Sequence, residues 1–293
     1  FVPNRHDEGE KQLSHRFDNA IISNAGEEEY RVVIDHILQK TEVARYLSRQ
    51  LHIWFVGADI DALTEANIIE PLAQIIIEDD YEVQRALETL LSSTFFFDTT
   101  HRGCMVSHPI DFLFRIANTL GMDQTDAGLI AHYRFWNQLR RVTSDLEMEI
   151  MGIPSVAGWR AFYQAPSFYQ LWINSFSLTL RQESGERLLS GINQGGFRWE
   201  PDLLAFIAEM DNNLDPNALL EQIALYLFAF PIAANQRDFL KEVLIPGLPD
   251  FEWTIEYSDY LQNPDDEDLR TAVITKLEAV FGTLLKMPEF HLL

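Results

Sequence analysis

Histidines beside carboxylates are the side chains of this sequence best suited to hold a metal ion or to transfer a proton. His6, Asp7 and Glu10 lie close together near the start of the chain, and His101 and His108 follow Asp98 further along it. A structural zinc site needs four ligands in a tetrahedral arrangement, and neither group offers a full set at a characteristic spacing. We therefore expect no metal site and no cofactor. The first group is interpreted as a solvated loop, and the second as a set of packing or capping residues.

Carboxylates alone are a second possible source of chemistry, because the chain has 45 acidic residues against 22 basic ones. A hydrolase of the glycosidase type needs two carboxyls about 5 to 10 Å apart, one of them in apolar surroundings. The sequence contains no nucleophile motif and no glycine-rich phosphate loop. Hydrolysis by paired carboxylates is therefore the alternative hypothesis, and we lean toward a protein that is not an enzyme.

The formal net charge of −23 limits the class of partner. Binding to a nucleic-acid backbone needs clustered Lys and Arg, so we expect no nucleic-acid partner. The charge is uneven along the chain. Residues 121–200 are close to balance, whereas residues 201–293 carry a large excess of Asp and Glu. An acidic surface of this kind mainly serves solubility.

Apolar residues make up 47% of the 293-residue chain, which is enough for a sizeable core. No apolar run approaches the ~20 residues that a membrane-spanning helix needs, so we expect no membrane-spanning segment. The chain begins at Phe1 without a signal-peptide pattern, and we expect it to be part of a longer protein. The single Cys104 excludes an intrachain disulfide.

Residues 150–174 interrupt the helical patterns and concentrate aromatic side chains between two prolines. Pro154 favours an extended residue before it, and Gly158 permits a positive φ that other residues resist. Trp159 can then bury its ring in the core, and we expect it to be largely buried. We interpret this pattern as an irregular segment, residues 150–166, held by a structural motif of Pro154, Val156, Gly158 and Trp159.

The same stretch has a second, functional interpretation. Exposed aromatic side chains beside a cation can form a recognition surface, and the members here are Arg160, Tyr163, Tyr169 and Trp172. Finding all three aromatic members buried would exclude this interpretation. The functional interpretation predicts a surface that binds a protein or a glycan.

Apolar residues recur at i, i+3, i+4 and i+7 along most of the chain, as in amphipathic helices. Strand-like alternation is not evident. The pattern predicts an all-α fold, an irregular bundle of about ten helices into which the segment 150–166 packs. One helix over residues 125–150 is expected to direct five side chains to the core: Leu129, Tyr133, Trp136, Leu139 and Leu146.

Residues 190–196 are rich in glycine and mark the best candidate boundary between two parts of the chain. We expect residues 1–192 to form a helical core and residues 193–293 to form an acidic helical lobe docked on it. The second part carries several apolar stripes, and these must be buried against each other or against the core.

Several motifs, taken in order, resemble a large, uncharacterised bacterial family known as domain of unknown function 1800. The motifs are Asn4-Arg5-His6-Asp7, Val43-Ala44-Arg45-Tyr46-Leu47, Phe96-Phe97-Asp98, Arg102-Gly103-Cys104-Met105-Val106, Pro109-Ile110-Asp111-Phe112 and Pro154-Ser155-Val156-Ala157-Gly158-Trp159. The last is the most specific, because family members carry a very similar string after a long helix. The motifs cover residues 1 to about 190 and resemble the C-terminal portion of a longer member. Family members often have lysine-serine where this chain has Ser107-His108.

The resemblance implies an α-helical fold with no established activity, catalytic residues or cofactor. Genes of the family often lie beside those of a second family that looks exported and phosphatase-like. That association implies a cell-envelope location and a protein partner. Together with the aromatic stretch, it leads us to expect a non-catalytic binding or scaffold protein that docks a partner protein or a glycan.

Overall fold

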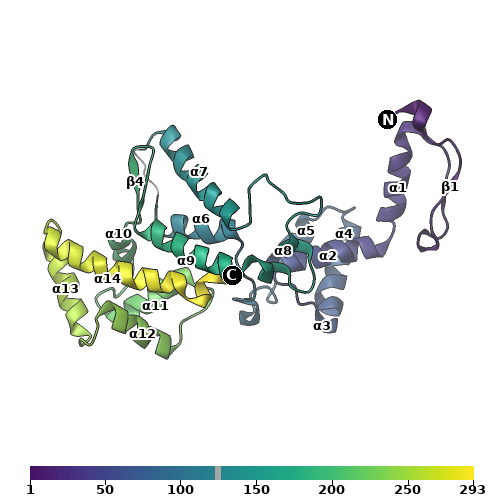
Figure 1. Cartoon of the computed structure of the whole chain (residues 1–293). Helices are drawn as coiled ribbons and strands as arrows, with labels where there is room; N and C mark the ends of the chain where they lie inside the picture. The colour runs from purple at the N-terminus through teal and green to yellow at the C-terminus, as the bar shows by residue number, and fades with distance from the viewer. Residues whose placement is uncertain (123–126) are drawn as a thin grey trace. The chain divides into compact units, whose positions relative to one another are not determined.

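The computed structural model describes residues 1–122 and 127–293, and the chain divides into two compact units, Phe1–His101 and Arg102–Leu293. The described residues are predominantly helical, which confirms the all-α prediction (Figure 1). The exceptions are two short antiparallel strand pairs that the sequence analysis did not predict. Among the described residues, no helix has the length and apolar character needed to cross a membrane.

The first unit is built on the packing of α2 against α4, with α5 closing the apolar side of α4. The buried side chains include Ala44 from α2, Ile76 from α4 and Leu90 from α5. A π-helical turn, Glu65–Ile69, leads into α4. Pro71 lies in the first turn of α4, a position that tolerates proline. The elements are β1 Lys11–Gln12, β2 Ile21–Ile22, α1 Glu29–Leu38, α2 Thr41–Phe55, α3 Ala62–Thr64, α4 Glu70–Glu78 and α5 Gln84–Leu91.

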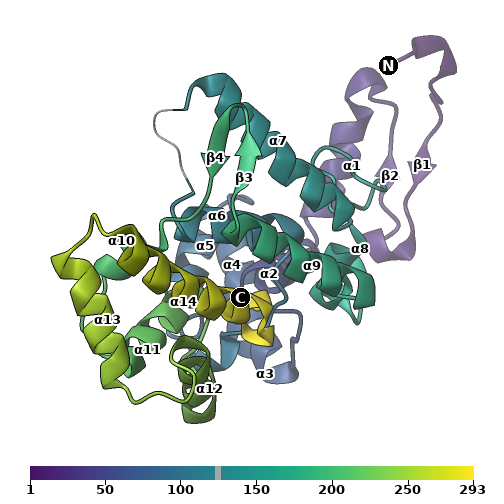
Figure 2. The ribbon, with the colours of Figure 1, turned by 60° about the vertical axis from the view of Figure 1, so that its left-hand side comes forward.

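The second unit surrounds α14, which packs against α9, α12, α13 and α10. One side of α14 supplies buried residues from Val273 to Leu285, and Figures 1 and 2 show it lying along α9. The elements are α6 Pro109–Thr119, α7 Leu129–Asp145, α8 Arg160–Tyr163, α9 Ser175–Leu189, β3 Ile192–Gln194, β4 Phe197–Trp199, α10 Leu203–Ala208, α11 Pro216–Leu227, α12 Ala234–Leu244, α13 Phe251–Gln262 and α14 Glu267–Lys286.

Within the glycine-rich stretch 190–196, expected to be a boundary, residues 192–196 are instead part of the β3–β4 hairpin. Gly195 and Gly196 both have positive φ, as a two-residue hairpin turn requires. Trp199 is fully buried, stacks on Phe135 of α7 with ring centroids 4.5 Å apart, and donates its indole N–H to the Gln194 carbonyl at 3.0 Å. Figure 2 shows the hairpin beside α7. The expected boundary at 192–193 therefore falls inside the second unit, and one apolar core joins residues from both sides of it.

Helix α7 turns a different face to the core than the sequence analysis expected. Leu129, Tyr133 and Trp136 were predicted to point inward, and each is more than half exposed. The buried face of α7 is formed by four other positions of the helix: Ala131, Phe135, Leu139 and Thr143. Leu139 and Leu146 are buried as predicted. The first two residues of the predicted helix over 125–150 lie outside the described residues. In the structure, α7 runs from Leu129 to Asp145.

The final segment, Pro288–His291, is a 3₁₀ turn that attaches to the residues before α6. The Ser107 backbone N–H donates to the His291 carbonyl at 2.8 Å, and Arg181 donates to the Ser107 carbonyl at 2.7 Å. Arg115 donates to the Phe290 and Leu292 carbonyls. The partly buried Arg115 therefore holds this segment directly, and the buried Arg181 holds Ser107, to which the segment is bonded, both through neutral acceptors. Burial lowers the pKa of each to about 10.

Candidate functional site

The aromatic segment begins where α7 ends, and local backbone features direct it. Gly158 has a φ of +91°, and a Cβ added there would meet no atom within 4 Å. Glycine is thus required by conformation rather than by space. The Ser155 hydroxyl donates to the Gly158 carbonyl and accepts from the Ala157 N–H, which closes a tight turn. Trp159 follows as the residue that precedes α8.

Contacts between aromatic rings then pack α8 against the 3₁₀ turn Phe168–Trp172. Phe162 lies edge-on to both Trp159 and Trp172, with centroid separations of 6.2 and 5.6 Å. This cluster also includes the buried side chains of Met148 and Ala161. Edge-to-face contacts of this kind add to the burial of apolar area. The cluster fixes the ring of Trp159 and the first turn of α8.

A cavity of about 370 Å³ opens beside this cluster, and we call it the Trp159 pocket. It brings together six of the eight residues predicted from the sequence as structural or recognition residues. The exceptions are Val156 and Tyr169. The lining residues are Glu147, Pro154, Ser155, Gly158, Trp159, Arg160, Ala161, Tyr163, Leu171 and Trp172.

The predicted recognition residues differ in exposure. Arg160 is exposed and Tyr163 is 45% exposed, whereas Tyr169 is partly buried and Trp172 is only 5% exposed. Trp172 therefore supplies a wall rather than a free surface. Trp159 is partly buried, less than the sequence analysis expected, because its ring borders the cavity. Since the aromatic members are not all buried, the finding that would exclude the recognition hypothesis is not observed, and the hypothesis stays a prediction.

Polar groups of the Trp159 pocket are available to a ligand. Arg160 and Glu147 form no ion pair with a described residue, and neither the Tyr163 hydroxyl nor the Trp159 indole N–H has a hydrogen-bond partner in that part of the chain. The pocket thus offers a cation, an anion, two neutral hydrogen-bonding groups and aromatic surface. Few convergent polar groups in an apolar wall are typical of binding sites.

The loop leading into the pocket carries apolar side chains that face solvent. Met151 is 92% exposed, Ile153 is also exposed, and Val156 is fully exposed. We call these three residues the apolar loop. The part of the predicted plug before Gly158 is therefore on the surface, while the aromatic part packs into the fold. Exposed apolar clusters on a folded surface indicate contact with another molecule.

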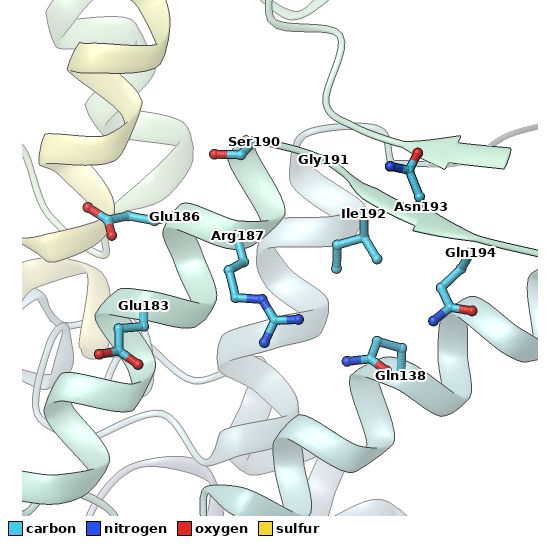
Figure 3. A pocket seen from close by; sticks show the side chains of 9 residues that line it. All are labelled: Gln138, Glu183, Glu186, Arg187, Ser190, Gly191, Ile192, Asn193 and Gln194. Carbon is cyan, nitrogen blue, oxygen red and sulfur yellow. The ribbon is translucent and has the colours of Figure 1, made fainter.

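A second, larger cavity of about 740 Å³ lies between α7, α9 and β3, and we call it the Arg187 groove (Figure 3). The Arg187 side chain extends from α9 into the hollow, and the Gln138 carboxamide reaches toward it from α7. Ile192 and Gln194 point into the same space from β3, while the Asn193 side chain points away from it. The sequence analysis did not identify this groove, because its walls come together only through the unpredicted hairpin.

The histidine groups hold no metal site within the described residues. His6 lies 3.2 Å from the Glu29 carboxylate. His108 precedes α6, and its Nδ1 accepts from the Asp111 N–H at 3.1 Å, while its Nε2 lies 2.9 Å from the Asp111 carboxylate. The predicted capping role of His108 is confirmed.

Carboxyl groups give no sign of a general acid in the described part of the chain. Every carboxyl whose pKa departs from its ordinary value has it lowered. For Glu65 the main cause is its hydrogen bond with Arg49, and for Asp250 the hydrogen bonds with Asn217 and Lys241. A general acid of a glycosidase needs the opposite shift, produced by apolar surroundings. These carboxylates are therefore placed for ion pairing and helix capping.

Comparison with known proteins gives one match. A family model described as "Protein of unknown function (DUF1800)" matches residues 1–292. The match extends through the acidic C-terminal part, beyond residue 190 where the sequence motifs ended. No curated protein and no solved structure matches the chain.

Proposed function

The chain belongs to the DUF1800 family, and from the geometry of its site we propose that it is a non-catalytic binding protein of the bacterial cell envelope. In this proposal the Trp159 pocket and the apolar loop together dock a partner protein. The observation that carries it is the juxtaposition of unpaired polar groups in the pocket with three exposed apolar side chains on the loop beside it.

A protein partner fits this combination for a physical reason. Protein interfaces take most of their binding energy from a few apolar and aromatic anchors surrounded by polar contacts. Met151, Ile153 and Val156 can act as anchors that leave water on docking, while Arg160 and Glu147 can pair with charges of the partner. Because neither charge is paired with a described residue, such pairs break none of the ion pairs that the structure describes.

A glycan is the second candidate occupant, and the ring of Trp159 is the observation that favours it. An aromatic face beside hydroxyl and charged groups suits a sugar, which has apolar C–H faces and polar edges. The hydrolase alternative lacks comparable support. Among the described residues, Glu147 is the one carboxylate that lines the Trp159 pocket, and a glycosidase needs two.

The envelope location and the identity of the partner rest on the family association given above. An exported, phosphatase-like protein encoded nearby is the first partner to test. Co-purification of the full-length protein from its native cells, followed by identification of bound proteins, reports the partner and the compartment together.

Site-specific photo-crosslinking tests the docking surface directly. A photoreactive amino acid at Val156, in the apolar loop, is compared with the same group at Leu225 of α11, which is also exposed. We expect one discrete protein adduct from position 156 in native cells, and its loss when Trp159→Ala is added. Equal adduct patterns from both positions would contradict the proposal. A glycan would be identified instead if cell-wall oligosaccharides quench the tryptophan fluorescence of the wild type but not that of the Trp159→Phe variant.

A further inference from the structure

Arg187 lines the Arg187 groove, and two further arginines lie on α7, on the stripe that carries the lining residue Gln138; none of the three has an ion-pair partner among the described residues. Arg187 comes from α9, and Arg134 and Arg141 lie on α7 on either side of Gln138. All three are exposed. Positions 134, 138 and 141 share one stripe of the helix, because they are spaced by four and three residues. The two arginines of α7 are therefore about 10 Å apart along the helix axis, with Gln138, which lines the groove, between them in sequence.

This concentration of free cations is unusual for a chain with a net charge of −23. Elsewhere, most arginines and lysines of the described residues face a carboxylate, as Arg49 faces Glu65 and Lys241 faces Asp250. Near the groove, Glu186 already pairs with Lys286 of α14. Acidic side chains thus neutralise cations in most places and leave those of this groove free.

Glu183 is the one nearby carboxylate that lines the groove without a partner among the described residues. It is four residues before Arg187 on α9, a spacing that permits a helical ion pair. Such exposed pairs are weak because water screens them. A ligand carboxylate that accepts two parallel hydrogen bonds from Arg187 has the stronger geometry and can displace this pairing.

The rest of the lining favours hydroxyl groups. The carboxamides of Gln138 and Gln194 each offer both donors and an acceptor. In the β3–β4 hairpin, Asn193 lies opposite Arg198. This pair is next to Gln194 and Phe197, the two residues that flank the turn. The backbone N–H and C=O of Asn193 therefore point away from β4, toward the free edge of β3. Among the lining residues named, Ile192 is the one with a large apolar side chain.

We propose that the Arg187 groove binds an anionic glycan, a chain of sugars carrying carboxylates as in polyuronates. The arginines pair with the carboxylates, and the amides and the β3 edge bond to the hydroxyls. A nucleic acid fits less well, because three guanidinium groups neutralise few phosphates and the remaining surface is acidic. This site is separate from the Trp159 pocket and does not depend on the docking proposed for it.

Isothermal titration of the full chain with tetragalacturonate tests the proposal. We expect binding that weakens as salt is raised, because exposed charge pairs are screened. A neutral galactose tetramer and short poly-L-glutamate serve as comparison ligands, and both should bind at least about tenfold more weakly. Equal binding of the neutral sugar would overturn the role of charge. Equal binding of poly-L-glutamate at this site would mean an acidic peptide ligand, and absence of tetragalacturonate binding at millimolar concentration would overturn the proposal outright.

Variants locate the site. Arg187→Gln and Arg141→Gln should each weaken tetragalacturonate binding by at least about tenfold, the loss expected for one charge-assisted contact. The matched control is Arg270→Gln on α14, which removes an equally exposed arginine without an ion-pair partner among the described residues. Gln138→Met tests hydroxyl recognition without changing charge, and it should also weaken binding. Equal effects of Arg270→Gln and Arg187→Gln would show a general charge effect and refute the assigned site.

Discussion

His291 should make the second unit lose stability as the pH falls below neutrality. Its ring is 2% exposed, it stacks on Phe112, and neither ring nitrogen has a hydrogen-bond partner in the described part of the chain. Burial, together with the charges of Arg181 and Arg115, lowers the pKa of His291 to about 4. An imidazole in this environment stays neutral in the folded state because its charged form would lose hydration and lie beside two positive guanidinium groups.

The size of the effect follows from the difference between the folded and unfolded pKa values. The unfolded imidazole has a pKa of about 6.5, so below that pH the unfolded chain binds a proton that the folded chain does not. Stability is then complete above pH 6.5 and declines as the pH falls toward 4. Between pH 7.5 and 5 the free energy of unfolding should fall by about 2 kcal/mol. For a unit of this size that corresponds to a melting temperature lower by about 4–8 °C.

Urea unfolding of the wild type and His291→Gln across this pH range measures the effect. His291→Gln should be less stable at pH 7.5, since it loses the stack on Phe112, but its stability should depend less on pH. His52 in the first unit also has a pKa lowered by burial, so the difference between the two proteins isolates His291. His15→Gln, an exposed position, is the matched control. Identical pH slopes for the wild type and His291→Gln would refute the reasoning.

Three further predictions concern stability and exposure. Gly103 has a φ of +72°, and a Cβ there would lie 2.5 Å from the Phe230 ring. Gly103→Ala should therefore lower the free energy of unfolding by about 2–4 kcal/mol in chemical denaturation. Gly196 also has a positive φ but open space around it, so Gly196→Ala should lower it by only about 1–2 kcal/mol. Trp172→Ala should cost about 3–5 kcal/mol by the same measurement, because the ring is buried; a loss below about 1 kcal/mol would mean that the aromatic cluster contributes little to the fold. Limited proteolysis with mass spectrometry should detect cleavage at residues 151–156 before the β3–β4 hairpin, because the loop is exposed and the hairpin is packed; first cleavage at the hairpin would contradict this.

Helix positions set by local signals were predictable from the sequence. The Asp215-Pro216 step is typical of a cap followed by a first turn, and the Asp215 carboxylate accepts from the Asn217 N–H at 2.9 Å. Leu277 and Phe281 are four residues apart, as on one face of a helix, and both are fully buried in α14. These signals act within a few residues, so no knowledge of the tertiary structure is needed to interpret them.

Features that depend on distant partners were not predictable in the same way. Trp136 and Tyr133 have the spacing of a core face, but the hairpin places Trp199 against Phe135 and so selects another face of α7. The Gly195-Gly196 pair is equally typical of a linker and of a hairpin turn. Packing decides between them, since a Cβ at Gly195 would lie 2.8 Å from the Ala131 backbone. For the candidate site, the sequence identified the residues of the Trp159 pocket but not the exposure of the loop before it.

The Arg187 groove shows why the charge of a whole chain is a poor guide to its ligands. A net charge of −23 argues against a polyanion as long as the charges are treated as evenly spread. Screening limits each exposed charge to about 8–10 Å at physiological salt, so a ligand in the groove experiences the local arginines more than the distant acidic helices. Those helices still repel an anion from most of the surface. A polyuronate would thus be directed to the arginines near this groove, and high salt would weaken both the attraction and the repulsion.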